Sequence, residues 1–230
     1  MSDELSPLTD FAGTARLFPL PNLVLFPHVM QPLHIFEPRY RQMTADALDS
    51  DRLITLALLR PGWEADYDGK PAIHPIACLG RIVAEQRLDD GRFNILLRGL
   101  SRLRILEEIP TGKLYRSARV ELLRDCGAPS GKDERRLRRR LSTAVVEWFP
   151  SQGAVLEQFR KLLKSELQLG PLADIIAFAL PIELAVKQEL LEELDVGHRL
   201  RRLLKYMDAH PQTAAPAATE RKFPPEFSVN

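Results

Sequence analysis

The chain has 230 residues, of which 45% are hydrophobic and 27% charged, the composition of a soluble globular protein with one large or two small domains. Its 32 Lys and Arg balance 31 Asp and Glu, so no overall charge favours nucleic acid or an anionic membrane surface. The start lacks a secretory signal pattern, no apolar run reaches the roughly 18 residues of a membrane span, and two cysteines cannot form a disulfide framework, so we expect a cytoplasmic protein without a membrane partner.

Prolines dominate the first part of the chain. Five of the 18 prolines lie between Pro19 and Pro38, which excludes a continuous helix over residues 17–36 because proline lacks the amide donor and clashes with the preceding turn. Short extended segments are therefore expected there. Pro38 suits a first helical position, so we predict a helix over about residues 38–49, followed by a buried strand over 53–59.

Alternating apolar residues return after a long loop predicted at 63–75. Further strands are predicted at 76–88, 93–97, 102–105 and 114–122, with a break at Gly99. Gly80 is expected to mark a bulge or a close approach of a neighbouring strand. Six or so short strands with one early helix favour a closed or nearly closed mixed barrel.

The pattern becomes helical after a breaker-rich linker at 125–131. Apolar stripes at helical spacing cover 137–149, 156–167, 175–180, 184–194 and 200–207. We expect Gly170-Pro171 to end the second helix and Asp195 to cap the last one. The predicted fold class is α+β, because strands precede helices. The predicted organisation is a flexible N-terminus at 1–14, a β-barrel at 15–124, the linker, a helical bundle at 132–208 and a disordered tail at 209–230.

Several segments resemble a known family. Residues 17–27 (LFPLPNLVLFP) and 32–40 (PLHIFEPRY) are similar to the Lon protease N-terminal, or substrate-binding, domain, as are residues 80–82 (GRI), 91–99 (GRFNILLRG) and the last two helices. The similarity covers about residues 15–207. It implies a PUA-like β-barrel followed by an α-helical bundle.

Two modules of full-length Lon have no counterpart in this sequence. Full-length Lon carries an ATPase module and a serine–lysine protease module, but no Gly-x-x-x-x-Gly-Lys-Ser/Thr phosphate loop occurs here and few residues follow Met207. We therefore expect a stand-alone, non-catalytic domain without a cofactor, for which a peptidase S16-like label does not mean activity. By resemblance, its partner is unfolded or misfolded polypeptide, for delivery to a protease or chaperone in trans.

No residue cluster predicts a catalytic or metal site. The five histidines are dispersed, and Cys78 lies within a predicted strand as a buried, inert thiol. The cluster at 34–40 is interpreted as architecture, with direct contact to a ligand as the alternative. In the architectural interpretation, Glu37 is expected to satisfy free amides at the helix start, Arg39 to pair with a carboxylate and Tyr40 to enter the core.

Trp63 and Tyr67 are the candidate polypeptide-binding residues. They lie in a polar loop where a large aromatic side chain has no obvious core partner, and aromatic residues on loops often anchor binding. The alternative is that Trp63 folds back as a lid over one end of the barrel. We predict binding at this loop and in the groove between barrel and helices.

Arg135, Arg136, Arg138 and Arg139 are the candidate residues of an alternative function. They belong to a basic run at 132–140, and PUA-type barrels also occur in RNA-binding proteins, so the run could bind nucleic acid. It also fits the solvated face of an amphipathic helix, without interleaved aromatic residues for base stacking. A scaffold for one folded partner is the third alternative.

Overall fold

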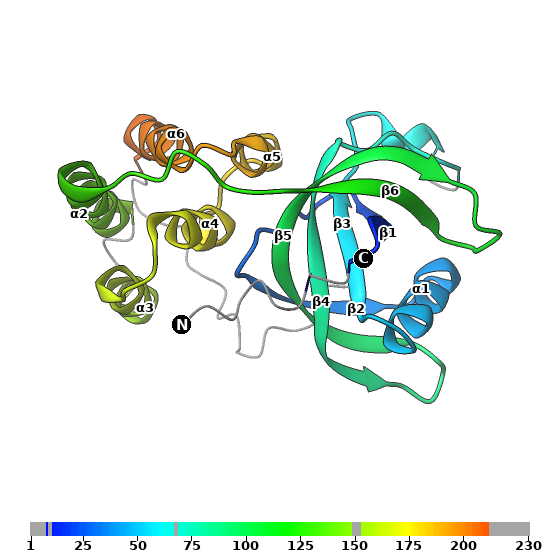
Figure 1. Cartoon of the computed structure of the whole chain (residues 1–230). Helices are drawn as coiled ribbons and strands as arrows, with labels where there is room; N and C mark the ends of the chain where they lie inside the picture. The colour runs from blue at the N-terminus through cyan, green and yellow to red at the C-terminus, as the bar shows by residue number, and fades with distance from the viewer. Residues whose placement is uncertain (1–7, 9–10, 67–68, 149–152, 212–230) are drawn as a thin grey trace.

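The strands and the last five helices occupy separate parts of the molecule in the computed structural model, which describes residues 8, 11–66, 69–148 and 153–211 (Figure 1). The first part contains β1 (Thr14–Leu20), β2 (Met30–Ile35), α1 (Pro38–Leu48), β3 (Leu53–Leu58), the short 3-10 helix η2 (Trp63–Asp66), β4 (Ile76–Arg87), β5 (Phe93–Ile109) and β6 (Arg116–Leu123). The second contains α2 (Gly131–Trp148), α3 (Gly153–Lys164), α4 (Leu169–Ala179), α5 (Leu184–Glu192) and α6 (Val196–Ala209). We call residues 14–123 the β region and residues 131–209 the helical region. The predicted α+β class is confirmed.

The six strands form one sheet in the order β2-β5-β4-β3-β1-β6, in which β1 and β3 are parallel and the other pairs antiparallel. Strand β6 also pairs with β5, so the hydrogen-bonded order returns to β5. This is possible because β5 is 17 residues long. Its first part pairs with β2 and its second part with β6. Small and branched side chains from every strand except β2 form a buried cluster that includes Leu17, Ala57, Leu79, Leu103 and Ala118.

The glycines of the sheet allow close packing. The predicted break at Gly99 is wrong, because β5 continues through this residue. A Cβ atom at Gly99 would collide with the carbonyl oxygen of Phe26, so glycine is needed for the approach of another backbone segment and not for a turn. At Gly80 the prediction is confirmed: the register shifts there, and a Cβ atom would lie 2.8 Å from Cγ of Leu97.

Helix α1 begins at Pro38, as predicted, and buries Tyr40 against the sheet. The expectation that the Glu37 carboxylate caps this helix is wrong, because that side chain makes no cap hydrogen bond. The Glu37 carbonyl oxygen instead accepts hydrogen bonds from the amides of Tyr40 and Arg41, and its carboxylate lies 2.8 Å from the guanidinium of Arg39.

Local signals located the last helix well and the boundary between α3 and α4 poorly. Asp195 caps α6 as predicted, since its carboxylate accepts a hydrogen bond of 2.7 Å from the His198 amide. Gly170-Pro171, expected to end a helix, lies instead in the first turn of α4. Proline is compatible with this position because the first-turn amides have no acceptor within the helix. None of the helices in the described residues is both long and apolar enough to cross a bilayer.

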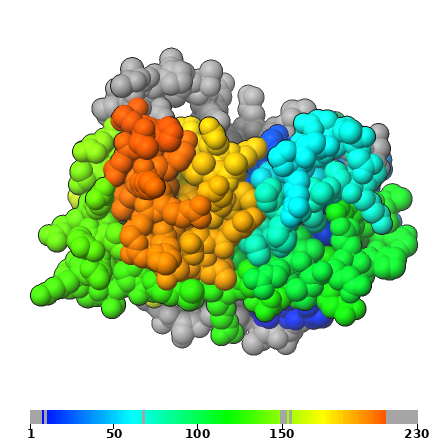
Figure 2. Space-filling model, turned by 90° about the horizontal axis from the view of Figure 1, so that it is seen from above, coloured from blue at the N-terminus to red at the C-terminus, as the bar shows by residue number. Residues whose placement is uncertain are grey.

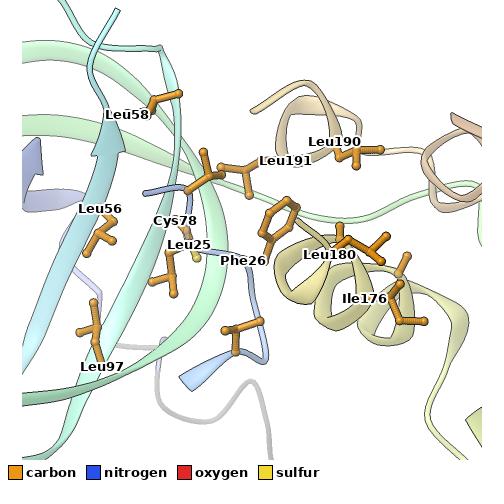
Figure 3. Close-up of a cluster of buried hydrophobic side chains, with 14 of the residues drawn as sticks. Leu25, Phe26, Leu56, Leu58, Cys78, Leu97, Ile176, Leu180, Leu190 and Leu191 are labelled. Atoms are coloured by element: carbon orange, nitrogen blue, oxygen red, sulfur yellow. The ribbon is translucent and has the colours of Figure 1, made fainter. Parts of the chain in front are cut away.

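The helical region packs against the β region through one continuous apolar core. Figure 3 shows Phe26 pointing from the β2 side toward Ile176 and Leu180 of α4, with Leu191 of α5 beside it. Next to this contact, the guanidinium of Arg102 on β5 forms hydrogen bonds of 2.9 and 2.6 Å with the Asp174 carboxylate on α4. The two parts are therefore joined by both an apolar contact and a buried ion pair.

Candidate functional site

A cavity of about 540 Å³ opens in the β region beside the loop that joins β5 to β6. This loop lies at the end of the β region farthest from helices α2–α6 (Figure 1). The walls come from four segments distant in the sequence: the end of β1, the first turn of α1, the stretch before β4, and the β5–β6 loop with the strand ends that flank it. The lining residues are Pro19, Arg39, Tyr40, Gly69, Lys70 and 108–117. In the space-filling view, the cyan segment after β3 lies on the surface beside the green strands β5 and β6 (Figure 2).

The β5–β6 loop is fixed against α1 by polar contacts. The Leu114 amide donates a hydrogen bond of 2.8 Å to the side-chain oxygen of Gln42. Asp46 accepts a hydrogen bond of 2.8 Å from the Tyr115 hydroxyl and lies 2.9 Å from the Lys113 ammonium. This contact with Lys113 holds the pKa of the Asp46 carboxyl below its ordinary value, so it stays ionised near neutral pH. The loop is thus positioned before any ligand binds.

Arg116 at the start of β6 connects two walls of the cavity. Its guanidinium binds the Glu108 carboxylate through two nitrogens and donates a hydrogen bond of 2.8 Å to the Pro71 carbonyl oxygen. The hydrogen bond from Arg116 lowers the pKa of Glu108. The segment before β4 is therefore held against the end of β5 by a planar cation that contacts both.

Lys70 stands at the edge of the cavity. Its backbone amide donates a hydrogen bond of 3.2 Å to the Asp66 carboxylate, and the Gly69 amide donates one of 2.9 Å to the Asp66 carbonyl oxygen. These bonds hold Gly69 and Lys70 against Asp66 at the end of η2. The side chain of Lys70 is exposed.

Both apolar and polar side chains line the cavity. Tyr40 and Tyr115 are buried in its wall, whereas Leu114 is 65% exposed. Tyr40 is anchored by the hydrogen bond of 3.2 Å from its hydroxyl to the Pro19 carbonyl oxygen. A leucine of this exposure next to a cavity gives a bound chain apolar area to cover. The described residues contain no group of three or more His, Cys, Asp or Glu placed to hold a metal ion.

Of the two predicted polypeptide-binding residues, Trp63 and Tyr67, the structure describes only Trp63. Trp63 begins η2, a helical turn within the predicted loop, and is half-buried. It does not line the cavity, although Gly69 and Lys70 of the same loop do. Tyr67 lies outside the described residues. Both the lid and the recognition interpretation of Trp63 remain predictions.

The basic run lies on the first half of α2, and several of its cations have partners within the chain. Arg138 donates hydrogen bonds to the carbonyl oxygens of Leu163, Ser165 and Leu167 near the end of α3. Arg136 lies 3.3 Å from Asp133. Arg135 and Arg139 are exposed. Nucleic-acid binding through this run remains a prediction.

The groove expected between barrel and helices is filled where Phe26 and Arg102 lie, since both side chains are buried there. The cavity itself was missed by sequence reasoning. Its cations Arg39, Lys70, Lys113 and Arg116 are scattered over three segments, without a spacing that indicates a shared site. Two segments singled out in the sequence do reach it: Arg39 and Tyr40 belong to the cluster at 34–40, and Gly69 and Lys70 to the loop predicted at 63–75.

The chain is similar to the N-terminal part of Lon proteases. A family model described as the ATP-dependent protease La (LON) substrate-binding domain matches residues 14–209. A Lon protease of Dictyoglomus thermophilum is 28% identical over 209 residues, which are 89% of this chain and 25% of that protein. This chain spans about a quarter of the length of the curated relatives it matches.

Two solved structures share the fold. The Lon N-terminal domain protein from Xanthomonas campestris has 24% identity and a TM-score of 0.61, covering 84% of this chain and 98% of that one. The N-terminal domain of a Mycobacterium avium complex Lon protease has 18% identity and a TM-score of 0.66, covering 86% of this chain and 99% of that one.

Proposed function

This chain belongs to the Lon substrate-binding domain family, and we propose that it is a non-catalytic module that binds unfolded or misfolded polypeptide at the cavity beside the β5–β6 loop. The observation that carries the proposal is the exposed Leu114 at a preorganised cavity in a chain matched by the family over residues 14–209. We interpret the six strands, whose order returns to β5, as the PUA-like barrel that precedes the helical bundle.

The family match favours a polypeptide as the occupant of this cavity. The volume of about 540 Å³ is within the range of about 300–1,000 Å³ that is usual for ligand sites, so it can hold a few side chains of a client. An unfolded client presents apolar side chains that a folded protein hides. Covering Leu114 with such a side chain removes apolar surface from water, which stabilises the complex by about 25 cal/mol per Å².

The test is a pair of matched substitutions. Leu114→Ser removes the apolar side chain beside the cavity, and Leu106→Ser removes one on β5 that is 55% exposed but does not line the cavity. With fluorescently labelled denatured casein, we expect Leu114→Ser to weaken binding about tenfold, because a buried leucine is worth about 1.5–3 kcal/mol. Leu106→Ser should bind like the unmodified chain. Equal affinities of the two variants contradict the site, and no binding of casein by the unmodified chain contradicts the function.

Trp63 and Tyr67 are proposed as further contacts for the client, since their loop continues into Gly69 and Lys70 at the cavity. Trp63→Ala should weaken casein binding by about 1–3 kcal/mol with little loss of stability if the indole contacts the client. If the indole is a lid, the same variant should lose about 3–5 kcal/mol of stability, with unchanged affinity per folded molecule. A thermal melt and a titration of this variant separate the two.

The adaptor role and the lack of catalysis are proposed together, for a module acting in the cytoplasm. Purified protein incubated with casein and ATP should release neither peptides nor phosphate. Mass spectrometry of proteins that co-purify with the tagged chain should return a protease or chaperone together with diverse clients. A single stoichiometric folded partner would instead favour the scaffold function.

A further inference from the structure

The cavity is lined by more cations than anions. Four cationic side chains, Arg39, Lys70, Lys113 and Arg116, line it against one carboxylate, Glu108. We propose that the cavity selects client segments in which an acidic residue is adjacent to an aliphatic one. This inference rests on the proposed function and names the class of polypeptide that the same cavity prefers.

Two of the four cations hold the protein itself together. Arg39 lies 2.8 Å from the Glu37 carboxylate, and the Arg116 guanidinium is engaged with Glu108 and the Pro71 carbonyl oxygen. Their charges are compensated within the fold. They shape the cavity and leave little free attraction for a guest.

Lys70 and Lys113 are the cations available to a guest. No carboxylate of the described residues lies within ion-pair distance of the Lys70 ammonium, whose backbone alone is fixed by Asp66. Lys113 is paired with Asp46, but the two side chains are 45% and 28% exposed, so a client carboxylate can share this ammonium. Glu108 also interacts electrostatically with Lys70, but its two oxygens are bound by Arg116, whose positive charge balances the carboxylate.

The aliphatic part of the preference comes from the residue next to Lys113. Leu114 follows it in the loop and exposes its side chain, and Ile109 and Pro110 line the same cavity. A cation and an apolar surface one residue apart match a client in which a carboxylate is adjacent to a leucine, isoleucine or valine. Charge complementarity therefore selects the segment, and apolar contact retains it.

The experiment uses two labelled peptides that differ only in a Glu or a Gln beside a leucine. Anisotropy titrations of the full chain at about 50 mM salt should show about fivefold tighter binding of the Glu peptide, the size expected for a partly exposed charge pair, and less difference at about 200 mM salt. Lys70→Gln should reduce the difference, and the double variant Lys70→Gln with Lys113→Gln should abolish it. Lys205→Gln, which removes an exposed cation from α6, should preserve it.

The outcomes separate this inference from the proposed function. Equal binding of both peptides, with casein still bound, overturns the preference for acidic segments and leaves polypeptide binding intact. Reduction of the difference in Lys205→Gln as well as in Lys70→Gln also overturns it, since the effect would then come from overall charge. Failure of both peptides and of casein to bind overturns the proposed function. Tighter, Lys70-dependent binding of a labelled RNA would assign the cavity to a different class of partner and overturn the inference.

Discussion

Where the β region meets the helices, Arg102 and Asp174 form an ion pair whose side chains are 3% and 1% exposed. At the other end of the β region, beside the cavity, Lys113 and Asp46 form one whose side chains are 45% and 28% exposed. The buried pair has lost its hydration and depends on its partners, whereas water can replace either partner of the exposed pair. The junction is therefore built to stay closed, and the cavity keeps charges that can exchange partners. Substitutions at the junction should therefore lower the unfolding free energy more than substitutions at the cavity.

The largest effect is expected for Asp174→Ala. The substitution leaves Arg102 buried without its main partner, and Arg199, whose Nε lies 3.2 Å from Asp174, loses the same carboxylate. Breaking a buried pair in this way costs about 3–5 kcal/mol, measured by urea denaturation. In the matched variant Asp46→Ala, loss of the ion pair with Lys113 should cost about 1 kcal/mol at most. Loss of the hydrogen bond from Tyr115 adds to this cost. Similar losses in both variants would contradict the comparison.

A smaller loss is expected for Tyr115→Phe. It removes only the hydroxyl that donates a hydrogen bond of 2.8 Å to Asp46, while the ring still fills the cavity wall. One hydrogen bond of this kind is worth about 1 kcal/mol of unfolding free energy. Urea denaturation measures the loss, and titration of the phenol absorbance gives a second readout. Burial and the Asp46 contact raise the pKa of Tyr115, so its phenol should ionise above the ordinary value of 10.0. Ionisation at or below the ordinary value would mean that the contact with Asp46 is absent in solution.

Acid should weaken the cavity end through Glu108. Arg116 holds the pKa of Glu108 below its ordinary value of 4.5, so the folded state binds a proton less readily than the unfolded chain. The resulting stability is present above pH 4.5 and is lost as the pH falls through the folded-state pKa. As the pH is lowered from 4.5, the urea concentration at the unfolding midpoint should therefore decrease. The decrease should be less steep in Glu108→Gln. An identical acid dependence in both proteins would exclude Glu108 as a contributor.

The smallest expected effect concerns the buried thiol of Cys78, which should not react with a thiol reagent in the folded protein. Burial raises the pKa of the Cys78 thiol to about 12, whereas Cys126 is exposed in the segment that leads to the helical region. A thiol reagent at about pH 8 should therefore label only Cys126 in the folded protein, because the thiolate is the reacting species. Both thiols should react in denaturant. Rapid labelling of Cys78 in the folded protein would show that the junction opens readily.

Prediction from the sequence was reliable where neighbours along the chain decide the structure. Pro38 begins α1, and Asp195 caps α6, because both act on amides within a few residues. It was wrong at Gly99 and at Gly170-Pro171. The conformational freedom of Gly99 serves contact with Phe26, which is distant in the sequence, and a proline is equally compatible with a helix start and a helix end.

The candidate site could not be predicted in the same way. Trp63 was singled out by its residue type, but the cavity is defined by cations and a leucine from the α1, pre-β4 and β5–β6 segments. Each of these residues is ordinary in its own segment. A lysine at 70 and another at 113 face one cavity only because Arg116 and Asp46 hold their segments together.

The sequence by itself determined the family, the α+β class and the local starts of helices, because apolar periodicity and short-range hydrogen bonds are encoded by adjacent residues. Only the tertiary structure decided which charges became buried and which stayed in water. Arg102 and Lys113 are both cations of the β region, yet one faces Asp174 on a packed helix and the other faces an open cavity. That difference follows from which distant segments pack against them, since burial depends on the assembled surface and not on the residue.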